Sequence, residues 1–396
     1  MRRIPLVLGS LGVIAMLGCS SSAGDDGSSG GDDTGSIGGD TGSIGGDSTS
    51  TGDSTTPTTD SGAPIDDSST TPPTDSGTTP TDSGTTPKDT GTTPETGPSG
   101  PSPMIGPCEI YPADNPWNQD VSKLPLHPSA STFAGTMHTG TSLHADWGTT
   151  AEGYGIPYNV GTGAPPQKMT WTASWGTTDS DPLKCADGYA WCYPIPGTSK
   201  IEGPSDSHLL FLDTAGAPKN CTLYELWQAS AFTGSGWTAS NGAIFHLGTN
   251  VLRSDGLTSA DAAGLPILPG LVRYEEVKAG AIKHAIRFTM NNTYNGYIHP
   301  ATHYAGLSSS AQPLMGLRLR LKSSVVITGY SKEAQVILQA MKTYGIILAD
   351  NGSNWYITGD ENDGWGAIQS GINDAFGKTH GGDFEAVDTG KTITSP

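Results

Sequence analysis

Two histidines four residues apart, His299 and His303, stand in the segment YIHPATHYAG. Histidines at that spacing share one face of a helix, where they could bind a catalytic zinc ion. The proline that directly follows His299 disfavours helical geometry there, and it occupies the place where such zinc hydrolases need a glutamate. The segment therefore argues against a zinc site, and we expect neither a metal nor another cofactor.

Carboxylates near two predicted strands offer a second kind of chemistry. Asp206 and His208 stand at the start of the strand-like run HLLFLD. Glu225 lies between Leu223 and Trp227 in LYELW. Apolar neighbours would raise the pKa of this glutamate by desolvation, which suits a general acid. A glutamate that points outward from the wet face of a sheet fits the same pattern, so both interpretations stay open.

Further histidines lie on strand-like segments. Alternation places His284 on the same strand face as Phe288, with Arg287 on the opposite face. A histidine in such a position is more often a hydrogen-bonded core residue than a catalyst. Three of them at strands or strand ends, His208, His284 and His303, nevertheless favour a shared cleft.

Other aspartates have a simpler local explanation. Asp255 and Asp261, in SDGLTSAD, are typical of residues that cap a turn or the start of a helix, and Asp350 belongs to an Asp-Asn-Gly turn. The segment GDENDG lacks the spacing of a calcium-binding loop. No G-x-S-x-G nucleophile motif, phosphate-binding loop or dinucleotide fingerprint occurs, so we expect no nucleotide cofactor.

The elements that must position these residues are mainly strands. Strand-length runs rich in aliphatic and aromatic residues occupy 208–213, 221–229, 242–248, 282–290, 315–322 and 325–330. In GLRLRLK, leucines alternate with Arg318, Arg320 and Lys322, as expected for a sheet with one face toward water. We predict a mainly β fold, a jelly-roll or two-sheet sandwich-like single domain with one or two covering helices.

One helix is clearly predicted in SKEAQVILQAMKTYG, with Ser331 as its N-cap and Gly345 as its C-terminal stop. A second, short helix is predicted to begin at Ser259 and to end at Pro266. The segment IILADNGSNWYITG predicts two short strands around a turn at 350–352.

The first nineteen residues, MRRIPLVLGSLGVIAMLGC, combine two arginines, an apolar run too short to span a bilayer comfortably, and a small-residue exit. These features are typical of an export signal. MLGC resembles the lipobox of bacterial lipoproteins, which implies that Cys19 becomes the lipidated first residue of the mature chain. A lipid-anchored protein of the bacterial cell envelope, at the outer membrane or cell surface, would contact the membrane only through that anchor. An ordinary cleaved signal is the alternative.

Residues 20–103 consist almost wholly of Gly, Ser, Thr, Asp and Pro, with tandem repeats of DTGSIGG and TTPTDSG. Such a segment cannot bury enough apolar surface to offset the entropy of ordering it, so we predict a disordered tether before a β-rich globular domain at 104–396. The net charge of −19 includes no basic block, which argues against nucleic acid as a partner.

Four cysteines fall within the predicted domain, an even number that suggests two disulfides in an exported chain. Four cysteines allow three pairings. The short Gly-containing segment CADGYAWC favours Cys185 with Cys192, which leaves Cys108 for Cys221. A zinc cluster is the rival interpretation, but the sequence contains no C-x-x-C pair.

The runs SADAAGLPILPGLVRYEEV, HAIRFT, MGLRLRLK and YGIILADNGSNWYITG resemble a family of secreted bacterial proteins for which no activity is known. The resemblance covers most of residues 106–390 and implies neither an activity nor a site. The residue types supply the hypothesis instead, because aromatic faces stack on sugar rings while carboxylates and amides bind hydroxyl groups. We therefore predict a monomeric surface enzyme that acts on polysaccharide or another glycan.

Hydrolysis is one mechanism that these residues could support. Glu225 would be the general acid and Asp206 the base or nucleophile. His208 would orient one of the two carboxyl groups, and Trp227 would contact the sugar.

Elimination is the other mechanism. His303 or Tyr304 would abstract a proton, while Arg287 or His284 neutralises a uronate carboxylate. A non-catalytic glycan-binding or adhesive module would need the aromatic residues but not the carboxylates. A structural envelope lipoprotein would bind no ligand.

Overall fold

The structure is a computed structural model that describes residues 101–203, 206–306 and 310–394. The predicted signal segment 1–19 with Cys19 lies outside these residues, and so does the predicted tether up to residue 100. Within the described ranges, no helix is long and apolar enough to cross a membrane.

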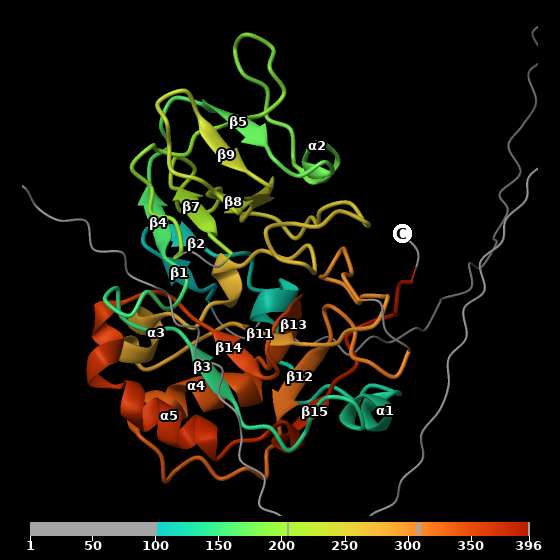
Figure 1. Ribbon diagram of the computed structural model, residues 1–396. Helices are drawn as coiled ribbons and strands as arrows, with labels where there is room; N and C mark the ends of the chain where they lie inside the picture. The colour runs from blue at the N-terminus through green and yellow to red at the C-terminus, as the bar shows by residue number, and fades with distance from the viewer. Residues whose placement is uncertain (1–100, 204–205, 307–309, 395–396) are drawn as a thin grey trace, which may run out of the picture. The chain divides into compact units, whose positions relative to one another are not determined.

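The described residues form a mainly β domain, as the sequence predicts, in which several sheets are accompanied by a few helices (Figure 1). The largest sheet has six strands in the order β15-β12-β13-β11-β14-β3. These strands are β3 (His144–Asp146), β11 (Ile286–Met290), β12 (Arg318–Leu321), β13 (Ile346–Asn351), β14 (Tyr356–Thr358) and β15 (Phe384–Ala386). The central strand β11 pairs in parallel with β13 and antiparallel with β14, so the sheet is mixed.

The second sheet has four strands in the order β10-β8-β7-β4. They are β4 (Tyr158–Gly161), β7 (Leu209–Asp213), β8 (Thr222–Trp227) and β10 (Asn241–His246). Both faces of this sheet are covered, because Leu210 and Leu212 join the main core while Leu209 and Phe211 join a second apolar cluster. Burial on both faces explains the unbroken apolar run at the start of β7.

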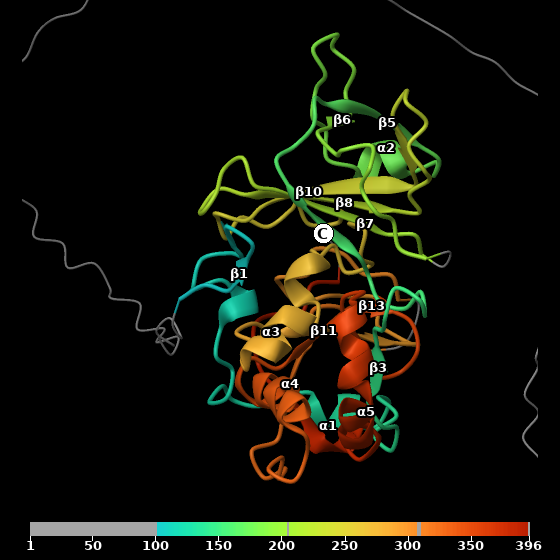
Figure 2. The same cartoon turned by 90° about the vertical axis from the view of Figure 1, so that its left-hand side faces the viewer.

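Smaller elements complete the upper half of the molecule in Figure 2. A three-stranded sheet, in the order β6-β5-β9, packs over the second cluster. Its strands are β5 (Gln167–Trp171), β6 (Cys192–Tyr193) and β9 (Trp237–Ala239). A two-stranded ribbon is formed by β1 (Met104–Ile105) and β2 (Cys108–Glu109).

Helices are short except for two that lie beside the six-stranded sheet in the lower half of Figure 2. The α-helices are α1 (Ala130–Ala134), α2 (Gly176–Asp179), α3 (Tyr274–Ala279), α4 (Lys332–Thr343) and α5 (Gln369–Gly377). The 3-10 helices are η1 (Pro116–Asn118), η2 (Leu268–Gly270), η3 (Asp363–Ala367) and η4 (Gly381–Asp383). Helix α4 is the one that the sequence predicts, and its N-cap Ser331 accepts a hydrogen bond from the backbone N–H of Ala334 at 3.2 Å.

Residues 258–272, which we call the bridging loop, run between the four-stranded and six-stranded sheets (Figure 2). The helix predicted from Ser259 to Pro266 is wrong, because this segment forms no helix and several of its backbone groups bond to the two sheets. The Asn241 side chain of β10 donates to the Ser259 carbonyl at 2.7 Å. On the other side, Ala263 N–H donates to the Ala349 carbonyl at 2.9 Å. These bonds fix the loop on an irregular course, in which η2 is the one helical turn.

The two strands predicted around the turn at 350–352 exist as β13 and β14, but they do not pair with each other. Strand β11 lies between them and bonds to both. The turn residues predicted correctly that the chain reverses here. The pairing differs because β11, more than fifty residues earlier in the chain, bonds to both strands. The turn therefore places Asp350 at the end of the central strands.

The strand predicted at 325–330 is wrong. This segment is a surface loop in which Val326 is 74% exposed. The ammonium group of Lys342, in α4, donates to the carbonyls of Ser323 and Val325, so these acceptors bond to a side chain rather than to a neighbouring strand.

The expectation that Arg318 faces water is also wrong. Its side chain is buried beneath the segment around η1, where the guanidinium donates to the carbonyl of Tyr344 at 2.6 Å and to that of Pro116 at 3.0 Å. Alternation correctly separated the leucines from the basic residues. It could not show that another part of the chain covers the basic face.

Two disulfides are present, and their pairing is the one that the loop spacing favours. Cys108 in β2 bonds to Cys221, which directly precedes β8, across a separation of 113 residues. Cys185 bonds to Cys192 across a separation of 7 residues.

We expect the two disulfides to stabilise the domain unequally, because a longer closed loop removes more entropy from the unfolded chain. Loss of the long-range bridge in a Cys108→Ala/Cys221→Ala variant should cost about 5 kcal/mol, against about 2 kcal/mol for Cys185→Ala/Cys192→Ala. Denaturant unfolding of both variants measures this. A larger loss from the short loop would contradict the expectation.

Candidate functional site

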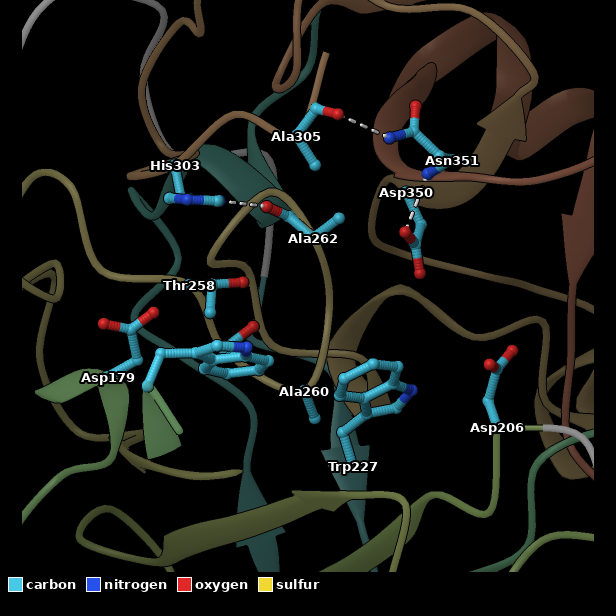
Figure 3. A pocket seen from close by; sticks show the side chains of 12 residues that line it. Asp179, Asp206, Trp227, Thr258, Ala260, Ala262, His303, Ala305, Asp350 and Asn351 are labelled. Atoms are coloured by element: carbon cyan, nitrogen blue, oxygen red, sulfur yellow. Dashed lines mark hydrogen bonds between the residues drawn. The ribbon is translucent and has the colours of Figure 1, made fainter. Parts of the chain in front are cut away.

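A cavity of about 480 Å³ opens where the bridging loop meets the ends of β8 and β13 (Figure 3). Its walls combine aromatic, acidic and small side chains. The lining residues are Trp175, Asp179, Asp206, Trp227, Thr258, Ser259, Ala260, Ala262, His303, Ala305, Asp350 and Asn351. Sequence analysis singled out Asp206, Trp227 and His303, and the structure brings these three together.

Two tryptophans provide the aromatic wall. Trp175 precedes α2 and Trp227 ends β8, and their ring centroids lie 6.0 Å apart with an interplanar angle of 20°. Trp175 is 38% exposed, so part of its surface is available to a ligand. Stacked, partly exposed indoles of this kind form a flat apolar surface that suits the C–H face of a sugar ring.

Asp206 and Trp227 are held side by side by an unusual pair of backbone conformations. Ser207 and Gln228 both have a φ of 52°, in the left-handed region that residues other than glycine rarely adopt. Gln228 N–H donates to the Asp206 carbonyl at 2.9 Å, and Ala229 N–H donates to the Ser207 carbonyl at 3.0 Å. Strained conformations are retained where the surrounding structure enforces them, and they are often found at functional sites.

The acidic wall rests on a buried ion pair. The carboxylate of Asp261, which is completely buried, accepts hydrogen bonds from Arg287 Nη2 at 2.8 Å and Nε at 3.1 Å. Arg287 also donates from Nη1 to the Thr358 hydroxyl at 2.7 Å. Its Nη2 lies 3.7 Å from the carboxylate of Asp350, whose side chain is 25% exposed. Asp350 thus separates this buried pair from the cavity.

The surroundings of Asp350 favour its protonated form. Burial raises its pKa well above the ordinary value, and the neighbouring Asp261 carboxylate adds to the shift through its charge and a hydrogen bond. Arg287 opposes the shift, but its own charge is already engaged by Asp261. The arrangement can hold a neutral carboxylic acid at the cavity wall near neutral pH, as general acid catalysis requires.

Glu225 is completely buried behind the cavity and is not one of its lining residues. Its carboxylate accepts hydrogen bonds from the backbone N–H groups of Ile267, at 2.9 and 3.0 Å, and of Leu268, at 3.0 Å. Burial raises the pKa of Glu225 to about 7, although these N–H groups oppose the shift. Glu225 therefore attaches the bridging loop to β8, and a ligand in the cavity would not contact it.

His208 also lies behind the wall. Its Nε2 is 3.1 Å from the Ala260 carbonyl, to which it must donate, and its Nδ1 is 2.6 Å from a carboxylate oxygen of Glu202. Burial lowers the pKa of His208, but the hydrogen bond and charge of Glu202 outweigh this effect and raise it above the ordinary value. Through its bond to Ala260, the His208 ring supports the part of the bridging loop that lines the cavity.

His303 lines the cavity directly. Its Nδ1 lies 2.8 Å from the Ala262 carbonyl, which can only accept, so the neutral ring presents Nε2 as its acceptor atom. Tyr304 stacks on this ring with centroids 5.7 Å apart but is not a lining residue. His303 is therefore the one basic side chain among the described residues of the cavity wall.

The structure does not bring His284 to this site. Its Nε2 lies 3.0 Å from Glu276, which also pairs with Arg273 at 2.8 Å. His284 precedes β11 rather than lying within it, and it belongs to a separate buried cluster against α3.

His299 is not among the residues that line the cavity. His299 is outside any helix and its Nε2 lies 2.8 Å from Asp255. Within the described part of the chain, no group of three histidine, cysteine, aspartate or glutamate side chains is arranged to hold a metal ion.

The sequence patterns did not indicate Trp175 and Asp179 as site residues, and they explained Asp261 and Asp350 by turns and caps alone. Asp350 does bond locally, accepting from the N–H of Asn351 at 2.7 Å, so the turn signal was correct but incomplete. Asp261 pairs with Arg287, which is buried and needs a carboxylate partner. The burial of that arginine is visible only in the fold.

Comparisons with known proteins do not identify a relative. No family model, curated protein or solved structure matches this chain. The candidate function therefore rests on the geometry and chemistry of the cavity.

We expect Arg287→Ala to lower the free energy of unfolding by about 3–5 kcal/mol, because it leaves the buried Asp261 carboxylate without its partner. The matched control is Lys378→Ala, which breaks a surface pair with Asp374 whose members are 60% and 58% exposed and should have little effect. Denaturant unfolding at neutral pH compares them. Equal stability of the two variants would contradict a structural role for the buried pair.

Proposed function

We propose that the protein is an envelope-attached enzyme that hydrolyses glycosidic bonds of a polysaccharide in this cavity. The observation that carries the proposal is the position of the Asp350 carboxyl group, which lines the same cavity as two stacked tryptophans and lies in surroundings that raise its pKa. Glycoside hydrolysis commonly needs such an acid together with a second carboxylate. Asp206 supplies a second carboxylate in the same cavity.

The roles follow from position. Asp350 protonates the glycosidic oxygen as the bond to the leaving sugar breaks. Asp206 activates a water molecule or attacks the sugar carbon, and Trp175 and Trp227 stack on the sugar ring. The acid role thus falls to Asp350 rather than to Glu225, whose carboxylate is enclosed by the bridging loop.

Elimination is the weaker alternative. His303 offers a basic Nε2 to the cavity, as a lyase would require. The groups expected to neutralise a uronate are engaged elsewhere, since Arg287 binds Asp261 and His284 binds Glu276.

The catalytic proposal is tested by incubating the full chain with a panel of plant, algal and microbial polysaccharides. At least one should release oligosaccharides. Asp350→Asn should abolish release while binding persists, because the amide cannot protonate the leaving oxygen. Asp374→Asn, on the surface, serves as the control and should retain activity.

Other outcomes would overturn the mechanism in different ways. Full activity of Asp350→Asn would remove it as the acid, and unsaturated products would indicate elimination. Binding without product would favour a glycan-binding or adhesive module. No binding to any polysaccharide would favour a structural envelope protein.

The envelope location is part of the proposal and rests on MLGC and the sequence that precedes it. We expect Cys19→Ser to move the protein from the membrane fraction to the soluble fraction, because the serine cannot receive the thioether-linked lipid. Immunoblotting of the two fractions measures this. Unchanged membrane retention would contradict the lipid anchor.

A further inference from the structure

We propose that the cavity selects a polysaccharide whose sugars carry unsubstituted amino groups, such as a polymer of glucosamine. This inference rests on the proposed function and narrows its substrate class. Three features of the described cavity support this selectivity. They are the acidic character of its lining, the surplus of carboxylates behind it, and the aromatic wall between two of its aspartates.

The lining itself is acidic. Asp179, Asp206 and Asp350 face the cavity, and the lining residues that the structure describes include no lysine or arginine. Figure 3 shows Asp179 and Asp206 on opposite sides of Trp227. With Asp350 assigned to the acid role, the carboxylates of Asp179 and Asp206 remain to attract cationic groups of a ligand.

The charged groups behind the lining do not cancel the negative charge of the cavity wall. The Asp261 carboxylate lies 2.8 Å from the guanidinium of Arg287 and balances its charge. The Glu202 carboxylate lies 2.6 Å from the ring of His208 and does the same there. Asp146 is a further acid close enough to Arg287 and Asp206 to interact with both charges. Arg287 and His208 thus each have a carboxylate partner, so the cavity retains a negative potential, which low-dielectric walls concentrate.

Charge at the edge of the site follows the same pattern. Arg253, which bonds to both α2 and the bridging loop, pairs with Asp181 at 2.9 Å and donates to the carbonyls of Asp179 and Thr258. Its side chain is 5% exposed, so it supports the wall rather than facing a ligand. A uronate carboxylate would therefore meet carboxylates without an available guanidinium.

The aromatic wall suits a cationic sugar as well as a neutral one. Indole faces attract ammonium groups through their negative quadrupole, and they also stack on the apolar face of the ring that carries the ammonium. Trp227 thus lies where a glucosamine ring could stack while its amino group pairs with a flanking aspartate.

Isothermal titration calorimetry tests the inference with the full chain carrying Asp350→Asn, which prevents turnover. The probes are hexamers of glucosamine, of N-acetylglucosamine and of galacturonic acid. We expect the glucosamine hexamer to bind at least about tenfold more tightly than its acetylated counterpart. Its affinity should fall as salt rises from about 50 to about 500 mM, because salt screens charge pairing. The galacturonic acid hexamer should not bind.

A second substitution assigns the selectivity to a residue outside the proposed catalytic pair. Adding Asp179→Asn should reduce affinity for the glucosamine hexamer at least about fivefold while changing binding of the acetylated hexamer little. Adding Asp374→Asn, a surface change, should affect neither. Equal loss for both hexamers would mean that Asp179 only shapes the wall, and it would overturn the charge-based selectivity.

The remaining outcomes separate the inference from the proposed function. Equal or tighter binding of the acetylated hexamer, or binding of the galacturonic acid hexamer, would overturn amino-sugar selectivity while leaving a glycan-active cavity. If none of the three hexamers binds and no polysaccharide of the panel is cleaved, both the inference and the proposed function fail.

Discussion

The ion pair between Asp261 and Arg287 is the interaction on which the site depends. It joins the bridging loop to the central strand of the six-stranded sheet, where water is excluded from both partners. Charges removed from water are stabilising only when they are paired and fully hydrogen-bonded, so this contact tolerates few alternative positions of the loop. The same loop is fixed on its opposite side by Glu225, which accepts from the N–H groups of Ile267 and Leu268. Two carboxylates thus clamp one segment between two sheets.

The clamp explains why a cavity exists and why its chemistry is acidic. The bridging loop is bonded to both sheets, and its small residues Ala260 and Ala262 line the cavity together with Trp227 and Asp350. Asp350 then lies beside a carboxylate that has already taken the charge of Arg287. Burial, and then the charge of this neighbouring carboxylate, disfavour the ionised form of Asp350 and raise its pKa. Structural stability and the proposed acid chemistry therefore share one set of contacts.

Sequence patterns predicted the features that local physics controls. Helix α4 follows from its N-cap and apolar stripe, the main strands follow from runs of aliphatic residues, and the small disulfide follows from a short loop. Patterns failed where distant segments meet. Arg318 alternates like a water-facing residue but is covered by the segment around η1, and Asp261 resembles a helix cap but pairs with a residue 26 positions away. Only the fold could distinguish Glu225, a buried clamp, from Asp206, a cavity residue.

The state of the Asp350 carboxyl group is the most direct test of this account. Carbon-13 NMR of selectively labelled aspartate side chains, with Asp350→Asn to assign the resonance, follows its titration. We expect the Asp350 signal to remain that of a protonated carboxyl group at pH values where ordinary aspartates, with a pKa of about 3.9, are already ionised. Titration of Asp350 together with those ordinary aspartates would contradict the account, because neither a coupled carboxyl pair nor a general acid would then exist at the cavity wall.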